Sequence, residues 1–245
     1  AGDLVLEVGP GTGALTEELL ARGGRVVACE LDRGLAELLR ERFGGGDGAG
    51  PRPLAESAPP HAGRFTLIEG DCLASKRELS AEVAKELAGR PFRLIANLPY
   101  SAATPLMLTL LINHPNCSSM HVTIQKEVAD RLLAGPSSKD YGTLGVVAQS
   151  VARVERVAVL PPECFWPRPD ITSAMVSITR RPDPLTTKPA QVAEFCQKAF
   201  SKRRKQLGAI LGRNLAWPPG IRPENRVEEL PVERIVALAA AADSL

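Results

Sequence analysis

The sequence of 245 residues lacks the features that mark membrane and secreted proteins. It contains no run of about 18 consecutive apolar residues, which a membrane-spanning helix needs. Its first residues show no basic stretch followed by an apolar run and a small-residue cleavage site, which is the pattern of a secretory signal peptide. We therefore expect a cytoplasmic protein with no membrane-spanning segment.

Paired cysteines are also lacking. The chain has five cysteines, an odd number, and no two of them form a Cys-x-x-Cys pair. Disulfide frameworks and structural zinc sites use cysteines in pairs at characteristic spacings, so we expect free thiols in a reducing compartment and no bound metal. The five are Cys29, Cys72, Cys117, Cys164 and Cys196.

A strong net charge is missing as well, but the charges are unevenly spread. The whole chain carries 30 Lys and Arg against 28 Asp and Glu, a net charge of +2. From Thr179 onward there are 12 cations and 7 acids, which leaves 18 cations and 21 acids before it, so the two parts carry about +5 and −3. We expect a polyanionic partner for the C-terminal part.

The first part alternates strand-like apolar runs with helix-like segments, which predicts an α/β fold with a parallel sheet and helices on both faces. The expected strands are Leu4–Val8, Arg25–Cys29, Phe65–Ile68, Arg93–Ala96, His121–Gln125, Val154–Leu160 and Ser173–Ile178. The expected helices are Ala14–Ala21, Leu35–Phe43, Leu79–Leu87 and Pro105–Ile112. Beyond residue 178, Gln191–Leu211 and Val232–Ala242 have helical character, so we predict two domains, 1–178 and 179–245.

Residues 44–63 interrupt this alternation. Ten of these twenty residues are Gly or Pro, so the stretch has too little apolar surface to offset the entropy of ordering it. We predict a mobile loop here rather than a binding element.

A glycine loop follows the first expected strand. Gly9, Gly11 and Gly13 alternate with other residues, and glycines let backbone N–H groups and a helix N-terminus approach a ligand closely. The spacing differs from the G-x-G-x-x-G of dinucleotide binders. Glu7, inside the strand, would repel a pyrophosphate but suits a cationic or zwitterionic ligand. A plain strand-to-helix turn is the alternative.

Two more acids stand where expected strands end. Glu30 ends the second strand, where a carboxylate can accept both hydroxyls of a ribose. Asp71 follows the third, where it can accept from an adenine amino group. With the glycine loop these acids predict a nucleoside site that has no phosphate-binding group, and S-adenosylmethionine fits such a site. The predicted cofactor site comprises Glu7, Gly9, Gly11, Gly13, Glu30, Leu31, Asp71, Cys72 and Asn97.

Longer motifs resemble one known family. The glycine loop together with Asn-Leu-Pro-Tyr at 97–100 is similar to the amino-methyltransferases that act on nucleic-acid bases. Four further stretches narrow the resemblance to the ribosomal RNA adenine dimethyltransferase family, over residues 4 to about 211. These stretches are QKEVADRLLA, KDYGTLGVVAQ, CFWPRPDITSAMVSI and FCQKAFSKRRKQLGAIL.

The resemblance implies a Rossmann-like, seven-stranded S-adenosylmethionine-dependent methyltransferase domain, followed by a small helical RNA-binding domain. It implies dimethylation of the N6 amino groups of two adjacent adenosines near the 3′ end of small-subunit rRNA, by a monomer acting on the immature subunit. It also implies a segment upstream of the first strand, outside these 245 residues. Methylation of large-subunit rRNA, a non-catalytic assembly role and, more distantly, DNA adenine methylation remain alternatives.

The predicted catalytic residues are Asn97, Leu98, Pro99, Tyr100 and, by resemblance, Phe165. An adenine amino group is a poor nucleophile because its lone pair is delocalised into the ring. The Asn97 side-chain oxygen and the Leu98 carbonyl can accept its hydrogens, while Pro99 keeps the turn rigid. Tyr100 and Phe165 offer faces on which an extruded base can stack.

A basic run lies near the C-terminal end of the resemblance. We expect Lys202, Arg203, Arg204 and Lys205 to lie on a helix and to contact RNA phosphates. Consecutive helical positions spread around the axis, so at least one of these side chains should pack against the first domain. A solvated basic face is the alternative.

Overall fold

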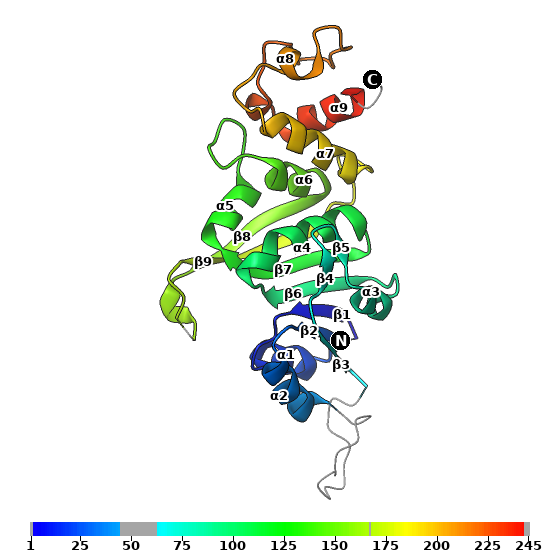
Figure 1. Cartoon of the computed structure of the whole chain (residues 1–245), viewed down its shortest axis with the longest axis vertical. Helices are drawn as coiled ribbons and strands as arrows, with labels where there is room; N and C mark the ends of the chain where they lie inside the picture. The colour runs from blue at the N-terminus through cyan, green and yellow to red at the C-terminus, as the bar shows by residue number, and fades with distance from the viewer. Residues whose placement is uncertain (1, 45–62, 167, 243–245) are drawn as a thin grey trace, which may run out of the picture.

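The computed structural model describes residues 2–44, 63–166 and 168–242. In this part of the chain a seven-stranded sheet runs in the order β3-β2-β1-β6-β7-β9-β8 (Figure 1). Its strands are β1 (Leu4–Val8), β2 (Arg25–Glu30), β3 (Phe65–Glu69), β6 (Phe92–Asn97), β7 (Cys117–Gln125), β8 (Ala152–Leu160) and β9 (Ser173–Arg180). The predicted mobile loop at 44–63 lies outside the described residues except at its two ends.

Strand direction divides the sheet into a parallel and an antiparallel part. β3, β2, β1, β6 and β7 are parallel neighbours, whereas β9 pairs antiparallel with β7 and with β8. The predicted Rossmann-like α/β fold is confirmed, with all seven expected strands in the sheet, but the sheet is mixed rather than wholly parallel. β7 begins four residues earlier than expected. Its first residues include the polar Ser118 and Ser119, so the buried Cys117 and Met120 beside them did not form a recognisable apolar run.

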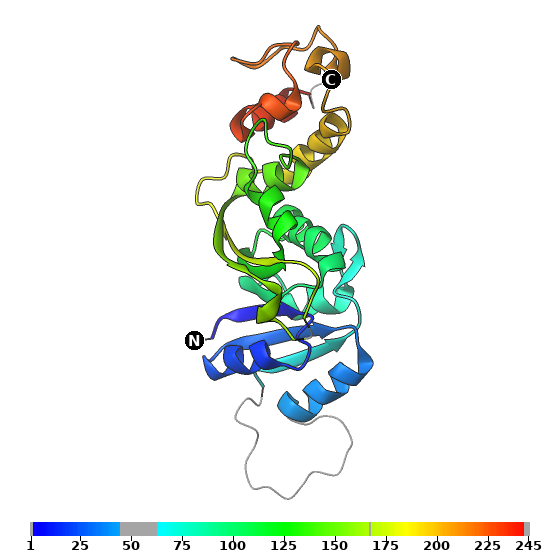
Figure 2. The ribbon, with the colours of Figure 1, turned by 90° about the vertical axis from the view of Figure 1, so that its left-hand side faces the viewer.

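Helices cover the sheet on two faces. They are α1 (Ala14–Ala21), α2 (Arg33–Phe43), α3 (Ala81–Leu87), α4 (Tyr100–Asn113), α5 (Lys126–Leu133) and α6 (Thr143–Val151). Alternate residues of β2 point to opposite faces. Val26 and Ala28 pack in a small cluster with Leu39 and Phe43 of α2, while Val27 belongs to the large core shared with α3–α6. Figure 2 shows α4 on one side of the strands.

Besides two short 3₁₀ turns, the described residues form α5, α6 and a short hairpin of β4 (Leu73–Ser75) with β5 (Glu78–Leu79), none of which was expected from the sequence. Seven of the nine residues of α6 are buried, so the segment shows none of the apolar-polar alternation that identifies a surface helix. The strands of the hairpin are three and two residues long, too short for a periodic signal.

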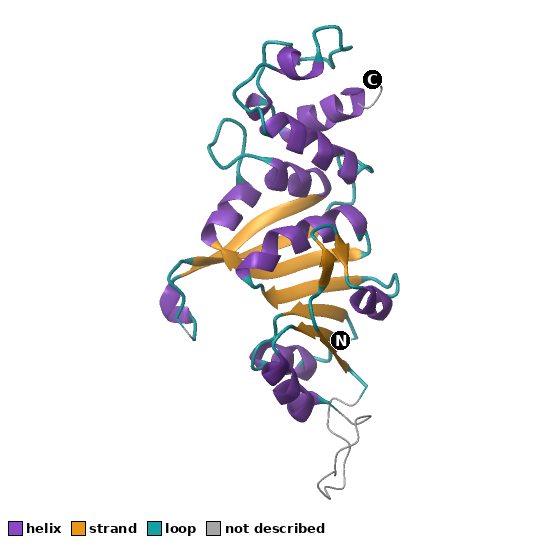
Figure 3. Cartoon of the chain, in the orientation of Figure 1, coloured by secondary structure: helices purple, strands orange, loops and turns teal. Residues whose placement is uncertain are grey.

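The C-terminal helices are α7 (Pro189–Phe200), α8 (Leu207–Leu211) and α9 (Val232–Ala242), which gather at one end of the molecule (Figure 3). The expected continuous helix 191–211 is wrong. The chain leaves the helix after Phe200 through successive i→i+3 turns, and the Leu207 and Gly208 N–H groups donate to the carbonyls of Asn225 and Pro223. Pairing with this distant segment replaces helical continuation.

No helix within the described ranges is long and apolar enough to cross a bilayer.

The expected domain boundary at 178/179 falls inside a strand. β9 continues to Arg180, two residues beyond the expected domain boundary, and buried residues of α7 and α9 belong to the same apolar core as the sheet. The division at 178/179 therefore stays a prediction.

Candidate functional site

The parallel strands end at one edge of the sheet, and the predicted site residues follow these ends. Val8 pairs with Cys29, Glu30 with Glu69, and Asn97 with Thr123, so the C-terminal ends of five parallel strands lie along one edge, within two residues of each other in register. In open α/β sheets ligands bind outside the carboxyl ends of such strands. The fold thus brings residues 7–13, 30–31, 71–72 and 97–100 to a common edge.

The glycine loop joins β1 to α1 in a backbone conformation that favours glycine. Gly9, Gly11 and Gly13 have φ angles of 69°, 60° and 85°. A Cβ on Gly13 would lie 2.5 Å from the Phe43 ring, whereas one on Gly11 would meet nothing within 4 Å. A Cβ on Gly9 would lie 3.0 Å from Pro99, so the loop touches the Asn-Leu-Pro-Tyr motif. Gly11 faces open space.

Glu30 is fixed at the end of β2 by backbone donors. Its two carboxylate oxygens accept from the N–H of Gly11 at 3.1 Å and of Asp32 at 2.9 Å, and the residue is 6% exposed. A carboxylate oxygen can accept two hydrogen bonds, so each retains capacity for a ligand hydroxyl. The next side chain, Leu31, is 72% exposed, which leaves an apolar surface beside the carboxylate.

Glu7 lies beneath the loop rather than on its open side. It is 1% exposed and accepts a hydrogen bond of 2.7 Å from the Thr16 hydroxyl of α1. Burial raises the pKa of its carboxyl to about 7, although the Thr16 hydrogen bond acts in the opposite direction. In this position Glu7 supports the loop from below, and its predicted contact with a cofactor stays a prediction.

The segment after β3 presents one exposed acid over one buried thiol. Asp71 is exposed, and one of its oxygens accepts from the Leu73 N–H at 2.9 Å. Cys72 is 3% exposed, and burial raises the pKa of its thiol to about 12, with further contributions from Cys29 and Asp71. The Cys29 thiol donates to the Gly70 carbonyl at 3.3 Å. Both thiols are therefore packing groups rather than nucleophiles.

A pocket of about 270 Å³ adjoins the Asn-Leu-Pro-Tyr motif, where β6 ends and α4 begins. The Leu98 N–H donates to the Thr123 carbonyl, and the Pro99 carbonyl accepts from the N–H groups of Ala102 and Ala103. The motif is thus held on both sides by backbone hydrogen bonds. The lining residues are Asn97, Leu98, Pro99, Tyr100, Phe165, Trp166 and Pro169.

The structure brings Phe165 to this pocket from far along the chain, through the loop between β8 and β9. Sequence reasoning missed Trp166 and Pro169, which line the same pocket. Both lie within the quoted stretch CFWPRPDITSAMVSI, and Trp166 is one of only two tryptophans in the chain. Their closeness in sequence to Phe165, which was predicted to line the pocket, is the signal that could have identified them.

The basic run occupies the turn after α7 and divides into two kinds of residue. Arg203 is half-buried: it pairs with Glu228 at 2.5 Å and donates to the carbonyls of Ser138 and Lys139, at 3.3 and 3.0 Å. Arg203 thus contacts residues 138 and 139, which precede α6, while the assignment of these residues to a separate first domain stays a prediction. Lys202, Arg204 and Lys205 are exposed.

These features fit S-adenosylmethionine chemically. Glu30 retains acceptors for ribose hydroxyls, Asp71 retains one oxygen for an adenine amino group, and Gly11 leaves room for a ligand against the loop. No group of three His, Cys, Asp or Glu suited to a metal ion occurs within the described residues. A seven-stranded Rossmann-like sheet with such an edge is that of an S-adenosylmethionine-dependent methyltransferase.

Comparison with known proteins defines the family. The sequence model described as "Ribosomal RNA adenine dimethylase" matches residues 1–243. The "Ribosomal RNA small subunit methyltransferase A" of Streptomyces coelicolor is 38% identical over 97% of this chain and 80% of its own length. The protein of that name from Phenylobacterium zucineum is 38% identical over 98% of this chain and 78% of its own length. The chain belongs to the ribosomal RNA adenine dimethylase family and is an rRNA methyltransferase.

Solved structures share the fold. A dimethyladenosine transferase from Plasmodium falciparum matches with a TM-score of 0.72 at 21% identity, over 99% of this chain and 90% of that one. The 23S rRNA methyltransferase ErmE matches with a TM-score of 0.62 at 22% identity, over 99% and 91%. The likeness therefore covers the C-terminal helices as well as the sheet.

Proposed function

We propose that the protein dimethylates the N6 amino groups of two adjacent adenosines near the 3′ end of small-subunit rRNA, during assembly of the subunit. The observation that carries this proposal is the pocket that joins residues 97–100 to Phe165 beside the cofactor edge. The names of the relatives at 38% identity favour small-subunit over large-subunit rRNA as the substrate.

The cofactor would lie along the strand ends. Glu30 would accept the ribose hydroxyls, Leu31 would cover the adenine, and Asp71 would accept from its amino group. When bound, S-adenosylmethionine supplies a methyl group on a sulfonium centre. Gly11 would allow the ligand to approach the loop, Glu7 would hold that loop in place through Thr16, and Cys72 would pack below the adenine site.

The target base would enter the pocket between Tyr100 and Phe165. Stacking on an aromatic ring contributes roughly 1–3 kcal/mol per base. The Asn97 side-chain oxygen and the Leu98 carbonyl would accept the amino hydrogens, which draws the nitrogen lone pair out of conjugation and directs it towards the methyl donor. Pro99 fixes the direction of the turn, because its carbonyl is bound to the first turn of α4.

Positioning and electrostatics would supply the rate. None of residues 97–100 is a His, Cys or Lys, so the chain offers no strong base in this motif. The amino nitrogen becomes cationic and acidic on methylation, and its proton can then pass to water. After the first transfer the nitrogen retains one hydrogen, so only one of the two acceptors is needed for the second transfer.

RNA outside the pocket would be bound by the basic turn. Lys202, Arg204 and Lys205 are exposed for phosphate contacts, whereas Arg203 would hold the turn on the first domain through Glu228. We place the two functional units at 1–178 for catalysis and 179–245 for RNA binding. The predicted site residues lie on one chain, which supports a monomer, and ribosome assembly as the proposed setting supports a cytoplasmic location.

Methylation of isolated ribosomal particles tests the proposal. Immature small subunits and large subunits are incubated with the protein and labelled S-adenosylmethionine, and modified nucleosides are identified by mass spectrometry. We expect N6,N6-dimethyladenosine at two adjacent positions near the 3′ end of small-subunit rRNA, and none with Asn97→Ala. Label in large subunits alone would replace the proposal by the large-subunit alternative, and no label in either particle would reject catalysis.

A further inference from the structure

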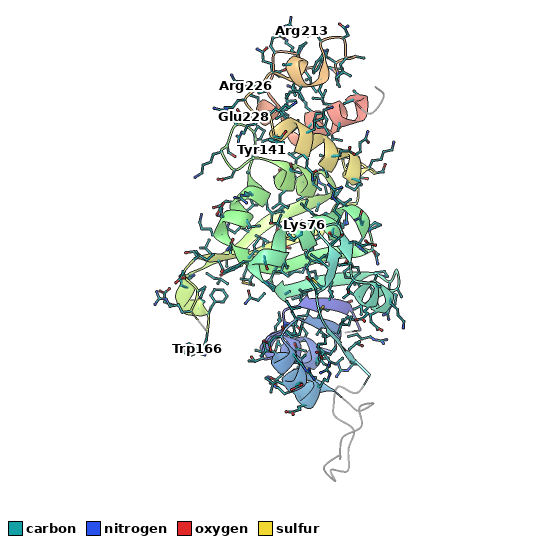
Figure 4. The ribbon with its side chains drawn as sticks, viewed as in Figure 1. Lys76, Tyr141, Trp166, Arg213, Arg226 and Glu228 are labelled. Atoms are coloured by element: carbon teal, nitrogen blue, oxygen red, sulfur yellow. The ribbon has the colours of Figure 1, made fainter. Side chains whose placement is uncertain are left out.

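Trp166 is an aromatic side chain without a protein partner in the described part of the chain. It is 97% exposed, while the neighbouring Phe165 is half-buried in the pocket wall. Figure 4 shows Trp166 at the tip of the loop between β8 and β9, pointing away from the sheet. An indole is among the largest apolar groups in proteins, so near-complete exposure beside a pocket indicates a surface for a ligand.

The two aromatic residues cannot serve the same base. Phe165 has an extended backbone, with φ −125° and ψ 148°, and consecutive side chains of an extended segment point to opposite sides. Phe165 lines the inside of the pocket with Asn97 and Tyr100, whereas Trp166 lies on its rim. One base in the pocket therefore leaves the indole free for another.

The loop holds Trp166 in place through its own backbone. Pro162–Cys164 form a short 3₁₀ turn, in which the Cys164 and Phe165 N–H groups donate to the carbonyls of Pro161 and Pro162. An ion pair of 2.5 Å between Arg168 and Glu163 links the two sides of the loop. Pro161 and Pro162, which begin this turn, restrict the backbone that precedes Trp166 further.

The charges of the loop favour a base over a phosphate as the occupant. The guanidinium of Arg168 is paired with Glu163, and the exposed Asp170 lies two residues further on. A loop in which acids balance the cation attracts a phosphate weakly, while an indole face accepts any of the four bases. A target base that leaves its stack also exposes one face of its neighbour.

We propose that Trp166 stacks on the nucleotide adjacent to the adenosine in the pocket and thereby holds the RNA strand in register. This inference rests on the proposed function. It assigns Trp166 as a positioning residue that is tolerant of base identity, because every base has a π-face. With two adjacent target adenosines, each would occupy the pocket while the other lies on the indole.

Substitutions at 166 test the proposal through methylation of immature small subunits. Trp166→Leu keeps a large apolar side chain without an aromatic face, and Trp166→Phe keeps the aromatic face at reduced area. We expect Trp166→Leu to lower kcat/KM about 5- to 150-fold, the equivalent of ~1–3 kcal/mol of stacking, and Trp166→Phe to recover most of it. Cofactor affinity should be the same in all three proteins.

Fluorescence provides a readout that a structural role would not move. Trp217→Phe leaves Trp166 as the sole tryptophan, and Trp217 lies in the C-terminal part with its N–H donating to the Arg213 carbonyl. Stacking should quench the remaining fluorescence when an RNA oligonucleotide with two adjacent adenosines is added. The quenching should fall when the base beside the target is replaced by an abasic residue.

The outcomes separate this inference from the proposed function. If wild type methylates small subunits while Trp166→Leu matches it, or if quenching is the same with the abasic strand, Trp166 does not stack on the neighbouring base. If wild type dimethylates neither particle, the proposed function fails first. Loss of activity in both Trp166→Leu and Trp166→Phe, with weakened cofactor binding, would indicate a role in folding of the loop and would also overturn the proposal.

Discussion

The proposed cofactor side and the proposed base side of the site are built in opposite ways. At the cofactor side the carboxylate of Glu30 is almost completely buried, and two backbone N–H groups fix it before any ligand arrives. At the base side Tyr100 is 42% exposed, and Trp166 has almost no contact with the protein. Glu30 is thus fixed by the protein alone, whereas the aromatic surfaces of the base side are left exposed for a ligand.

This difference predicts which property each substitution changes. A buried, hydrogen-bonded group contributes to folding as well as binding, because removing it leaves its partners unsatisfied. An exposed group contributes little to folding, and its loss is felt when the substrate is present. Substitutions at the cofactor side should therefore alter stability and cofactor affinity, and those at the base side should alter turnover.

The largest effect is expected from Asn97→Ala. The substitution removes one oriented acceptor at the reacting amino group, and loss of one such group typically lowers turnover by about a hundredfold or more. Cofactor affinity and unfolding free energy should be nearly unchanged, because Asn97 is exposed. Single-turnover methylation and calorimetry measure these quantities. A loss of less than about threefold in turnover would show that Asn97 has a structural role.

The next effect is expected at Glu7, where the pH dependence of stability tests whether burial disfavours the charged carboxylate. Its raised pKa of about 7, against 4.5 in an unfolded chain, means that its folded form prefers the proton. Its contribution to stability is full below about pH 4.5 and is lost as the pH rises through about 7. Glu7→Gln removes this dependence.

Relative to wild type, Glu7→Gln should gain on the order of 3 kcal/mol in unfolding free energy between about pH 4.5 and 8. Urea denaturation at several pH values measures the difference, and Glu18→Gln on the exposed face of α1 is the matched control. A constant difference across this range would mean that Glu7 ionises in the folded protein as it does in water.

Glu30→Ala should weaken cofactor binding without affecting RNA binding. In the proposed binding mode the substitution would leave two ribose hydroxyls without their charged acceptor, which would cost about 1.5–3 kcal/mol. That loss corresponds to a roughly 10- to 150-fold rise in Kd by calorimetry. Glu30→Gln keeps one acceptor and should lie between the two. An unchanged Kd in a folded Glu30→Ala protein would remove Glu30 from the cofactor site.

The cofactor side was also the side that sequence alone predicted. Gly11 and Asp71 follow strands within a few positions, Glu30 ends one, and the ends of parallel strands meet at one edge, so strand prediction places these three residues together. The burial of Glu7 was not predictable in this way. Whether an acid inside a strand faces the ligand or the helix below depends on the partner Thr16, nine residues away.

The base side depends on contacts between distant segments. Phe165 and Trp166 reach the pocket through a loop more than sixty residues after the Asn-Leu-Pro-Tyr motif, and no local pattern encodes that approach. Only family resemblance suggested Phe165. The break in the helix after Phe200 has the same origin, because hydrogen bonds from Leu207 and Gly208 to residues 223–225 decide it.

The smallest effect is expected from the basic turn, where a half-buried cation, Arg203, neighbours exposed ones. Arg204 and Lys205 are exposed, so Arg204→Glu with Lys205→Glu should leave unfolding free energy and cofactor affinity unchanged. Each lost phosphate contact should lower the slope of log affinity against log salt by about 0.7–0.9. Affinity for immature small subunits, measured across a salt series, gives this slope for wild type and the double variant.

Arg203→Gln is the matched control on the neighbouring residue. It breaks the ion pair with Glu228 and the hydrogen bonds to Ser138 and Lys139, so it should lower the unfolding free energy. A pair about one-third exposed contributes less than a buried one, and we expect a loss of about 1 kcal/mol, with a smaller change in salt slope than in the double variant. Equal slopes in wild type and the double variant would make the turn a solvated face. A reduced slope in Arg203→Gln alone would reverse the assignment: Arg203 would contact RNA, and Arg204 and Lys205 would not.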